Sequence, residues 1–201
     1  MIGILSYGIG NLTSIRSMLN SIGSEAVFID KPVDIKNAKK LILPGVGSFD
    51  GGMQALNDSG LKDHLDEAVL EDKKPIIGIC LGAQMMGHGS EEGDLPGLAW
   101  LNFECRKLKP IDDRPVPHMS WNNVISKSPD QILASSFEDQ RFYFVHSYRM
   151  VERDPNIVLG QTDYGGAFTS AVSRDNIIGV QFHPEKSHKF GKELFSRFIA
   201  T

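Results

Sequence analysis

The stretch Pro75–Met86, PIIGICLGAQMM, joins a short apolar run to a segment with helical character. The apolar part, Ile76–Ile79, has the length and the bulky aliphatic residues of a strand that is buried on both faces. Cys80 follows it directly, with one glycine two residues before and another two residues after. The stretch therefore predicts a strand–turn–helix unit of an α/β sheet, with a thiol at the turn.

The first half of the chain alternates in the same way between apolar runs and segments with a helical period. The predicted strands are Ile2–Leu5, Ala26–Ile29, Lys40–Leu43 and Pro75–Ile79. The predicted helices are Leu12–Ile22, capped by Asn11 and ended by Gly23, and segments near Gly52–Asn57 and Leu61–Glu71. Such alternation predicts a parallel sheet with helices on both faces.

The second half of the chain is richer in strands. The predicted strands are Trp100–Leu108, Arg141–Met150, Asn156–Thr162, Phe168–Ser173 and Ile177–Phe182, and a last helix spans about Lys189–Ile199. We therefore expect an α/β fold: a three-layer, mostly parallel sheet with an antiparallel extension. No linker or repeat interrupts the pattern, so we expect residues 1–201 to form a single domain.

The composition excludes several classes of protein. With 41% hydrophobic residues, 23% charged residues and a net charge of −4, the chain lacks the basic surface that nucleic acid or an anionic membrane requires. No apolar run approaches the roughly 18 residues that span a bilayer. The opening residues MIGILSYG lack the features of a signal peptide. We expect a cytoplasmic protein in which Cys80 and Cys105 are free thiols.

Cys80 is the first candidate for chemistry. Sites in a parallel α/β sheet form at the carboxyl ends of strands, and the positive end of a helix dipole favours a thiolate. The frame Gly78-x-Cys80-x-Gly82 resembles a nucleophile elbow with cysteine in place of serine. The alternative is a buried cysteine that only packs.

A base for this nucleophile is offered by the segment VQFHPEKS, Val180–Ser187. His183 follows the last strand, so it is expected at the same edge of the sheet, and Glu185 can accept its ring N–H. This is the logic of a triad of nucleophile, base and orienting acid. The alternatives are a turn that caps the last helix and a metal site with His188, whose spacing matches no zinc pattern. We expect no metal and no cofactor.

The loop in LILPGVGSF, Leu41–Phe49, follows another predicted strand. Its glycines permit a backbone N–H to turn toward an oxyanion, so Val46 and Gly47 are candidates for an oxyanion hole, with the N–H of Leu81 as a second donor. A phosphate-binding loop is the rival, but no Gly-Lys-Ser/Thr follows.

Eight segments in order carry a resemblance to a known family. They are YGIGN (7–11), LPGVGSF (43–49), GICLGAQ (78–84), SEEG (90–93), VPHMSWN (116–122), YFVHSY (143–148), TDYGG (162–166) and FHPEKS (182–187). Together they resemble the class I, triad-type glutamine amidotransferases. Within this family, the chain is most similar to glutaminase subunits that serve imidazole glycerol phosphate synthesis in histidine biosynthesis. The resemblance implies a flavodoxin-like fold.

The resemblance also implies a reaction and a partner. A Cys80 thiolate attacks the side-chain amide of glutamine, His183 passes a proton to the leaving ammonia, and water then hydrolyses the γ-glutamyl thioester. Positions that match glutamine-binding residues are Gly45, Gln84, Glu92, His146, Ser147 and Tyr148. Such subunits form a heterodimer with a (β/α)8-barrel synthase that receives the ammonia through a tunnel. Positions that match the partner interface and the tunnel mouth are Asn11, His118, Trp121, Asn122 and Lys186.

Some residues depart from the family pattern: Ser6, Ala83, Ser120 and the run Met85–Ser90. They leave the triad intact and open the question of the ammonia acceptor. The alternatives are a paralogous subunit that supplies nitrogen for a surface-polysaccharide sugar and a stand-alone γ-glutamyl hydrolase. A non-catalytic regulatory subunit would be expected to lack Cys80 or His183, and both are present.

Overall fold

Parallel strands form the centre of the molecule in the order β2-β1-β3-β4-β12. Their bounds in the computed structural model are β1 Ile2–Leu5, β2 Ala26–Ile29, β3 Lys40–Leu43, β4 Ile76–Ile79 and β12 Ile177–Val180. The structure describes residues 1–111, 114–127, 132–133 and 139–201. This strand order is the doubly wound, flavodoxin-like one, which places ligands at the carboxyl ends of the strands.

Antiparallel strands extend the sheet beyond β12 in the order β11-β10-β7, and β9 pairs with both β11 and β5. Their bounds are β5 Phe103–Lys107, β7 Ile125–Ser126, β9 Tyr148–Glu152, β10 Val158–Asp163 and β11 Ala167–Arg174. A separate antiparallel pair joins β6 His118–Asn123 to β8 Arg141–His146. The predicted fold class, a mostly parallel sheet with an antiparallel extension, is confirmed.

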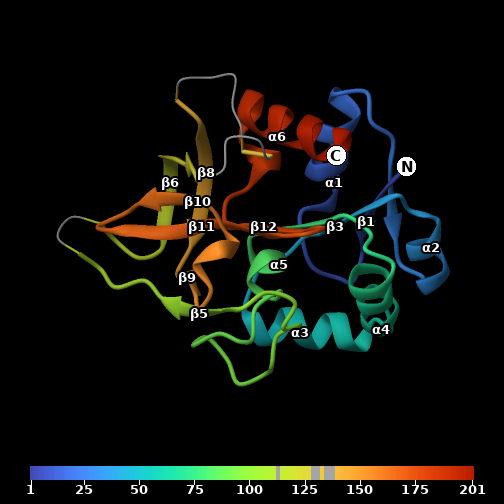
Figure 1. The fold of residues 1–201 in the computed structure, drawn as a ribbon, viewed down its shortest axis with the longest axis horizontal. Coiled ribbons are helices and arrows are strands. Elements are labelled where there is room, and N and C mark those ends of the chain that lie inside the picture. Colours follow the sequence, from blue (N-terminus) through green and yellow to red (C-terminus); the bar gives the residue numbers. More distant parts are fainter. Residues whose placement is uncertain (112–113, 128–131, 134–138) are drawn as a thin grey trace.

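Helices cover both faces of the parallel strands (Figure 1). The face with α1 and α6 packs on Ile77 and Ile79, and the opposite face, with α3 and α5, packs on Ile76. This division follows from the alternation of side chains along each strand. The bounds are α1 Leu12–Ser21, α2 Pro32–Asn37, α3 Phe49–Asp58, α4 Lys62–Asp66, α5 Leu81–Gln84 and α6 His188–Ala200, with the π-helical η1 Glu67–Glu71 and the 3₁₀ turns η2 Pro155–Ile157 and η3 Pro184–Lys186.

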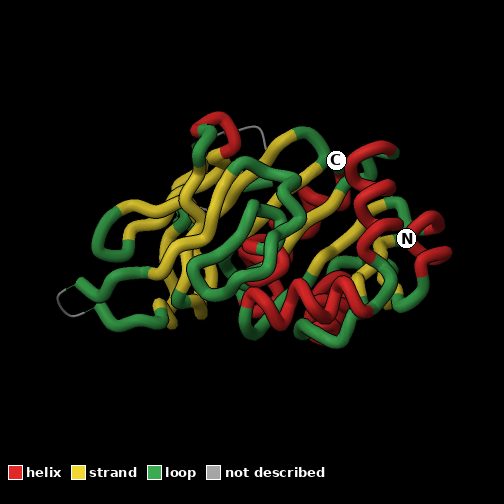
Figure 2. Tube along the Cα trace, turned by 90° about the horizontal axis from the view of Figure 1, so that it is seen from below, coloured by secondary structure: helices red, strands yellow, loops and turns green. Residues whose placement is uncertain are grey.

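The helices gather mainly at the end of the molecule that carries both termini, and the other end consists mostly of strands and loops (Figure 2). Within the described residues, no helix has both the length and the apolar character to cross a membrane.

Several predicted elements differ from the structure. The helix α2 and the strands β6 and β7 were not expected, and the predicted strand Arg141–Met150 is broken at Ser147 into β8 and β9. The predicted strand from Asn156 starts only at Val158, after the turn η2. Asn11 does precede α1, but its side chain makes no capping hydrogen bond. Gly23 ends this helix as expected, with a φ of 76° that suits glycine.

Candidate active site

Cys80 occupies a sharp turn between β4 and α5. Its backbone has φ 54° and ψ −111°, a conformation that costs energy in a non-glycine residue, and its N–H donates to the Val180 carbonyl at 2.8 Å. A Cβ on Gly78 would lie 2.8 Å from the Ala83 nitrogen, and one on Gly82 would lie 2.0 Å from the Leu43 oxygen. The two flanking glycines therefore let the turn close, as the sequence predicted.

His183 follows shortly after the end of β12, the strand that pairs with β4. A β-bridge to Tyr143 of β8 holds its segment in place. Its Nδ1 lies 2.8 Å from Oε1 of Glu185, and both side chains are about 1% exposed. Burial by itself lowers the pKa of His183. Interactions with the Cys80 sulfur and the Glu185 carboxylate outweigh this and raise the pKa to about 10.

The other ring nitrogen of His183, Nε2, is buried and makes no well-formed hydrogen bond to the described residues. It is the nitrogen left free for proton transfer, since Nδ1 is held by Glu185. The raised pKa means that the ring favours the charged form beside the sulfur. A thiolate–imidazolium pair with an orienting carboxylate is the arrangement that activates a cysteine for covalent catalysis.

A cavity of about 340 Å³ opens over Cys80 and His183. The predicted residues that line it are Val46, Gly47, Cys80, Leu81, Gln84, Glu92, His146, Ser147, Tyr148, His183 and Lys186. Pro117 and Val145 also line it and were not expected from the sequence. Gly45 does not line the cavity but packs under the loop against Gly82, and Glu185 stands behind His183.

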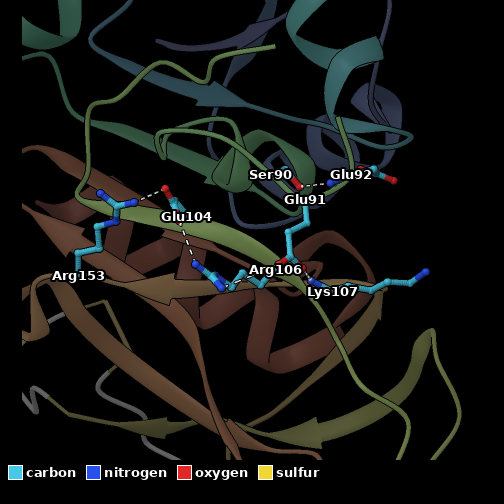
Figure 3. A network of polar contacts seen from close by, with 7 residues as sticks. All are labelled: Ser90, Glu91, Glu92, Glu104, Arg106, Lys107 and Arg153. Carbon is cyan, nitrogen blue, oxygen red and sulfur yellow. Dashed lines mark hydrogen bonds and ion pairs between the residues drawn. The ribbon is translucent and has the colours of Figure 1, made fainter. Parts of the chain in front are cut away.

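Glu92 reaches the cavity from the loop before β5, where hydrogen bonds fix its position. Its Oε2 accepts the N–H of Phe49 at 2.8 Å, at the N-terminus of α3, where a negative charge is favoured. Its own N–H donates to the Ser90 side chain at 3.1 Å. The neighbouring Glu91 points to the other side and accepts the Lys107 N–H at 2.8 Å (Figure 3). The loop is therefore tethered at both carboxylates.

Ion pairs along β5 continue this tether. Glu104 contacts Arg106 at 3.5 Å and also pairs with Arg153, and Arg106 reaches Glu91 at 3.9 Å (Figure 3). These side chains are largely exposed, so each pair contributes less than about 1 kcal/mol. Together they join the loop to two paired strands, which restricts the positions that Glu92 can take.

His146 lines the cavity, and each of its two ring nitrogens lies within hydrogen-bond distance of another group of the protein. Nδ1 lies 2.8 Å from the Tyr148 carbonyl oxygen, and Nε2 lies 3.0 Å from Nδ1 of His118. Because a carbonyl only accepts, His146 carries its proton on Nδ1 and accepts on Nε2 from His118. The far nitrogen of His118 lies 3.3 Å from the Asn122 amide, which also donates to the Asp163 carbonyl at 2.8 Å.

The imidazoles of His146 and His118 are neutral. Burial lowers the pKa of His146 to about 3, and burial together with the Arg114 charge lowers the pKa of His118 to about 4. His118 is fully buried and stacks between Phe144 and Tyr164, with centroid distances of 4.7 and 3.9 Å. The ring of His118 lies inside the chain, where it orients His146, and its expected place at a partner interface or tunnel mouth stays a prediction.

The other residues expected at a partner interface reach the surface. Trp121 on β6 is 42% exposed and stacks on His188 at 5.6 Å with an interplanar angle of 4°. Lys186 is exposed and lines the cavity, with its ammonium 5.7 Å from the Tyr143 ring centroid. Asn11 and Asn122 are partly exposed. The strand β8 connects the exposed face of β6 to the mouth of the cavity, since β8 pairs with β6 and its Tyr143 lies beside Lys186.

Two buried side chains near the site were missed by the sequence analysis. Gln181 is fully buried, and its Nε2 lies 3.8 Å from the Cys80 sulfur. Tyr7 donates its hydroxyl to the Pro44 carbonyl, at the start of the glycine loop. Gln181 stands two residues before His183, so the alternation of a strand could have placed both side chains on one side. No local pattern marks Tyr7.

Comparisons with known proteins agree over the whole chain. A family model described as glutamine amidotransferase class-I matches residues 4–201. Imidazole glycerol phosphate synthase subunit HisH 2 of Pseudomonas aeruginosa is 52% identical over 199 residues, which cover 99% of this chain and 98% of the relative. Subunit HisH 2 of Methanococcus maripaludis is 48% identical with the same coverage, and subunit HisH of Leptospira interrogans is 41% identical over 100% of both chains.

Solved structures share the fold at lower sequence identity. A crystal structure of a glutamine amidotransferase superimposes with a TM-score of 0.74 at 20% identity, covering 99% of this chain and 97% of that one. The structure of PurLQS from Thermotoga maritima superimposes with a TM-score of 0.69 at 20% identity and the same coverage. At such identity, the likeness speaks for the fold alone.

Proposed function

The chain belongs to the class I glutamine amidotransferases, and from this we propose that it hydrolyses glutamine through Cys80, His183 and Glu185 and delivers the ammonia to a barrel-shaped synthase subunit. The similarity to HisH subunits of imidazole glycerol phosphate synthase supports a role as the glutamine amidotransferase subunit of that enzyme in histidine biosynthesis. The observation that carries the catalytic assignment is the strained Cys80 beside the charged His183 at the floor of one cavity.

In the proposed reaction, the Cys80 thiolate attacks the carboxamide carbon of glutamine and forms a C–S bond. The carbonyl oxygen takes the negative charge and is held by N–H groups of the Val46–Gly47 loop and of Leu81. The His183 imidazolium gives its proton to the amide nitrogen, and the C–N bond breaks to release ammonia. Glu185 stabilises the charged ring.

The second half of the reaction returns the enzyme to its starting state. Neutral His183 takes a proton from water as the water oxygen attacks the thioester carbon, and the C–S bond breaks to release glutamate and the thiolate. Glu92 and Gln84 line the cavity with oxygen atoms that can accept from the α-ammonium group of glutamine. His146, Ser147, Tyr148 and Gly45 shape or support the same pocket.

The proposed partner is a (β/α)8-barrel synthase subunit that docks over the cavity mouth. The exposed Trp121, together with Asn11, Asn122 and Lys186, which also reach the surface, offers the aromatic and polar composition that is usual at the centre of interfaces. His118 supports this face from inside. We place the heterodimer in the cytoplasm and treat residues 1–201 as one domain.

A second candidate differs only in the ammonia acceptor: a paralogous subunit that supplies nitrogen for a surface-polysaccharide sugar. One observation favours keeping it. Ser6, Ala83, Ser120 and the run Met85–Ser90 depart from the family pattern, which leaves the ammonia acceptor open. The glutaminase chemistry is the same in both.

The test is a glutaminase assay of the purified chain, alone and with the barrel subunit encoded beside it. We expect weak activity alone and at least about tenfold stimulation by the partner with its ligand bound, which equals roughly 1.4 kcal/mol of barrier. Cys80→Ala should abolish glutamine use and leave synthesis from added ammonia intact. Full activity alone, unchanged by any partner, would instead identify a stand-alone γ-glutamyl hydrolase.

A further inference from the structure

The buried side chain of Gln181 belongs to a series of hydrogen bonds that links the Tyr148 carbonyl, through the side chain of Gln84, to the Cys80 sulfur. The series starts at the Tyr148 carbonyl, which accepts from Nε2 of Gln84 at 3.1 Å. The same Nε2 lies 3.0 Å from Oε1 of Gln181, and Nε2 of Gln181 lies 3.8 Å from the sulfur. Gln84 is 5% exposed and Gln181 is 0% exposed.

The polarity of this series follows from its first member. A main-chain carbonyl only accepts, so the atom of Gln84 that faces Tyr148 is its NH₂ group. That group also faces Gln181, so the Gln181 atom opposite it is the acceptor oxygen. The remaining polar atom of Gln181 is then its NH₂ group, and this group faces the sulfur. The alternative amide orientation would set two donors against each other.

From this geometry we infer that Gln181 donates an N–H to the Cys80 thiolate and is a further catalytic residue of the site. It touches the reacting sulfur from the side of β12, while His183 approaches from the turn beyond that strand. Its donor stabilises the negative sulfur in the resting enzyme and again when the thiolate leaves the thioester. Gln84 acts as a positioning residue by fixing which end of the Gln181 amide faces the sulfur.

Other groups around the sulfur also affect its charge. His183 lies beside it, and the Val145 carbonyl lies 3.9 Å from it. Glu92 and Lys186 line the same cavity with opposite charges, and His146 is neutral. Gln181 differs from all of these because it is an uncharged donor that does not titrate, so its effect should be the same at every pH at which the sulfur is ionised.

The inference rests on the proposed role of Cys80, and its test measures thiol reactivity rather than glutamine turnover. Gln181→Met keeps the volume and removes the donor; Gln161→Met, on β10, is the matched control. The probe is iodoacetamide, and the adduct at Cys80 is followed by mass spectrometry between pH 5 and pH 10. We expect the midpoint of the alkylation rate against pH to lie about one pH unit higher in Gln181→Met than in the wild type. Below the midpoint, the variant should therefore react about tenfold more slowly.

At high pH, the rates of Gln181→Met and the wild type should converge, because the thiol is fully ionised in both. A merely structural defect would lower the rate at every pH and would contradict the inference, as would a curve that superimposes on that of the wild type. Should glutamine hydrolysis be absent in the wild type while the curve still moves, the proposed function fails and the Gln181 assignment stands.

A second measurement uses the unaltered protein and does not depend on the folding of a variant. The side-chain NH₂ resonances of Gln181 should move with pH at the midpoint of the alkylation curve. In Cys80→Ser, this movement should be lost. Resonances that are insensitive to pH in the wild type would overturn the assignment.

Discussion

Gly45 lies so close to Gly82 that a Cβ on Gly45 would stand 2.4 Å from the Gly82 nitrogen. This contact presses the glycine loop after β3 onto the first turn of α5. It brings Val46 and Gly47 to the wall of the cavity beside Leu81. The candidate oxyanion hole therefore depends on two glycines that are far apart in the chain and that face each other without side chains.

Gly45→Ala should separate these two segments. The added methyl group meets backbone atoms that cannot turn away, so we expect a loss of about 1–3 kcal/mol in the free energy of unfolding. Glutamine hydrolysis in the complex should fall by at least about tenfold, because one displaced oxyanion donor costs about 10²–10³ in rate in other enzymes. Urea unfolding and steady-state kinetics measure the two effects.

The matched control for this change is Gly89→Ala. A Cβ there would meet no atom within 4 Å, and the φ of Gly89 is not in the left-handed region. We expect this variant to match the wild type in both measurements. Equal behaviour of the two variants would show that the Gly45 contact has no role in the site.

The two cysteines should differ sharply in reactivity. A glutamine-like electrophile should modify Cys80 and leave Cys105 untouched, because Cys105 is 1% exposed and burial raises the pKa of its thiol. Intact-mass measurement should show one adduct in the wild type and none in Cys80→Ala. Similar adduct levels on both thiols in the folded protein would argue against an activated site.

Stability should fall as the pH drops from about 6.5 toward 4. The unfolded chain protonates His118 and His146 near their ordinary pKa of about 6.5, whereas the folded chain holds these pKa values at about 4 and about 3. The unfolded state therefore binds more protons in this window, which costs at most about 1.4 kcal/mol per pH unit for each ring. His183, with its raised pKa, is protonated in the folded state throughout this window, so it opposes the slope near pH 6.5 and adds none below about pH 5.5, where the unfolded chain is protonated too.

Urea unfolding at a series of pH values measures this slope. His118→Phe keeps an aromatic ring in the stack and should remove about one proton from the dependence. His64→Asn changes an exposed ring and should leave the slope unchanged. A wild-type stability that is flat between pH 6.5 and pH 4 would contradict the neutral state of the two buried rings.

Trp121→Ala should weaken binding of the barrel subunit by about 30-fold or more, the scale of about 2 kcal/mol at which a side chain counts as a hot spot. The ring is partly exposed, so the stability of the isolated chain should change little. Val33→Ala is the control, since Val33 is 62% exposed on α2 at the opposite end of the molecule (Figure 1). Calorimetric titration distinguishes the two, and equal affinities would place the interface elsewhere.

The parallel half of the fold could be predicted from sequence because its strands are continuous apolar runs. The strand β6, HMSWNN, could not, because its exposed residues include Met119 and Trp121 while its less exposed ones, His118, Ser120 and Asn122, are polar. The helix α2 has one buried apolar side chain, Ile35, and so shows no period. Such elements form through tertiary contacts that no local pattern contains.

The same distinction holds for the site. The relation of Cys80 to His183 follows from strand ends that meet at one edge of a parallel sheet. The burial of His118 depends on Phe144 and Tyr164, which come from distant segments. The contact of Gln181 with the sulfur depends on an amide orientation that only the assembled hydrogen bonds determine.

Because Cys105 is buried, the rate at which its thiol is modified reports how often this part of the structure opens. Cys105 lies on β5, which pairs with β9, and its buried sulfur lies 3.9 Å from the Gln84 carbonyl, so we expect a reagent to reach it only when β5 separates from its neighbours. The rate of its modification, compared with that of an unfolded thiol, gives the free energy of that opening. A single mass spectrum thus reports two quantities: the extent to which Cys80 is modified, and the fraction of molecules in which β5 has separated and exposed Cys105.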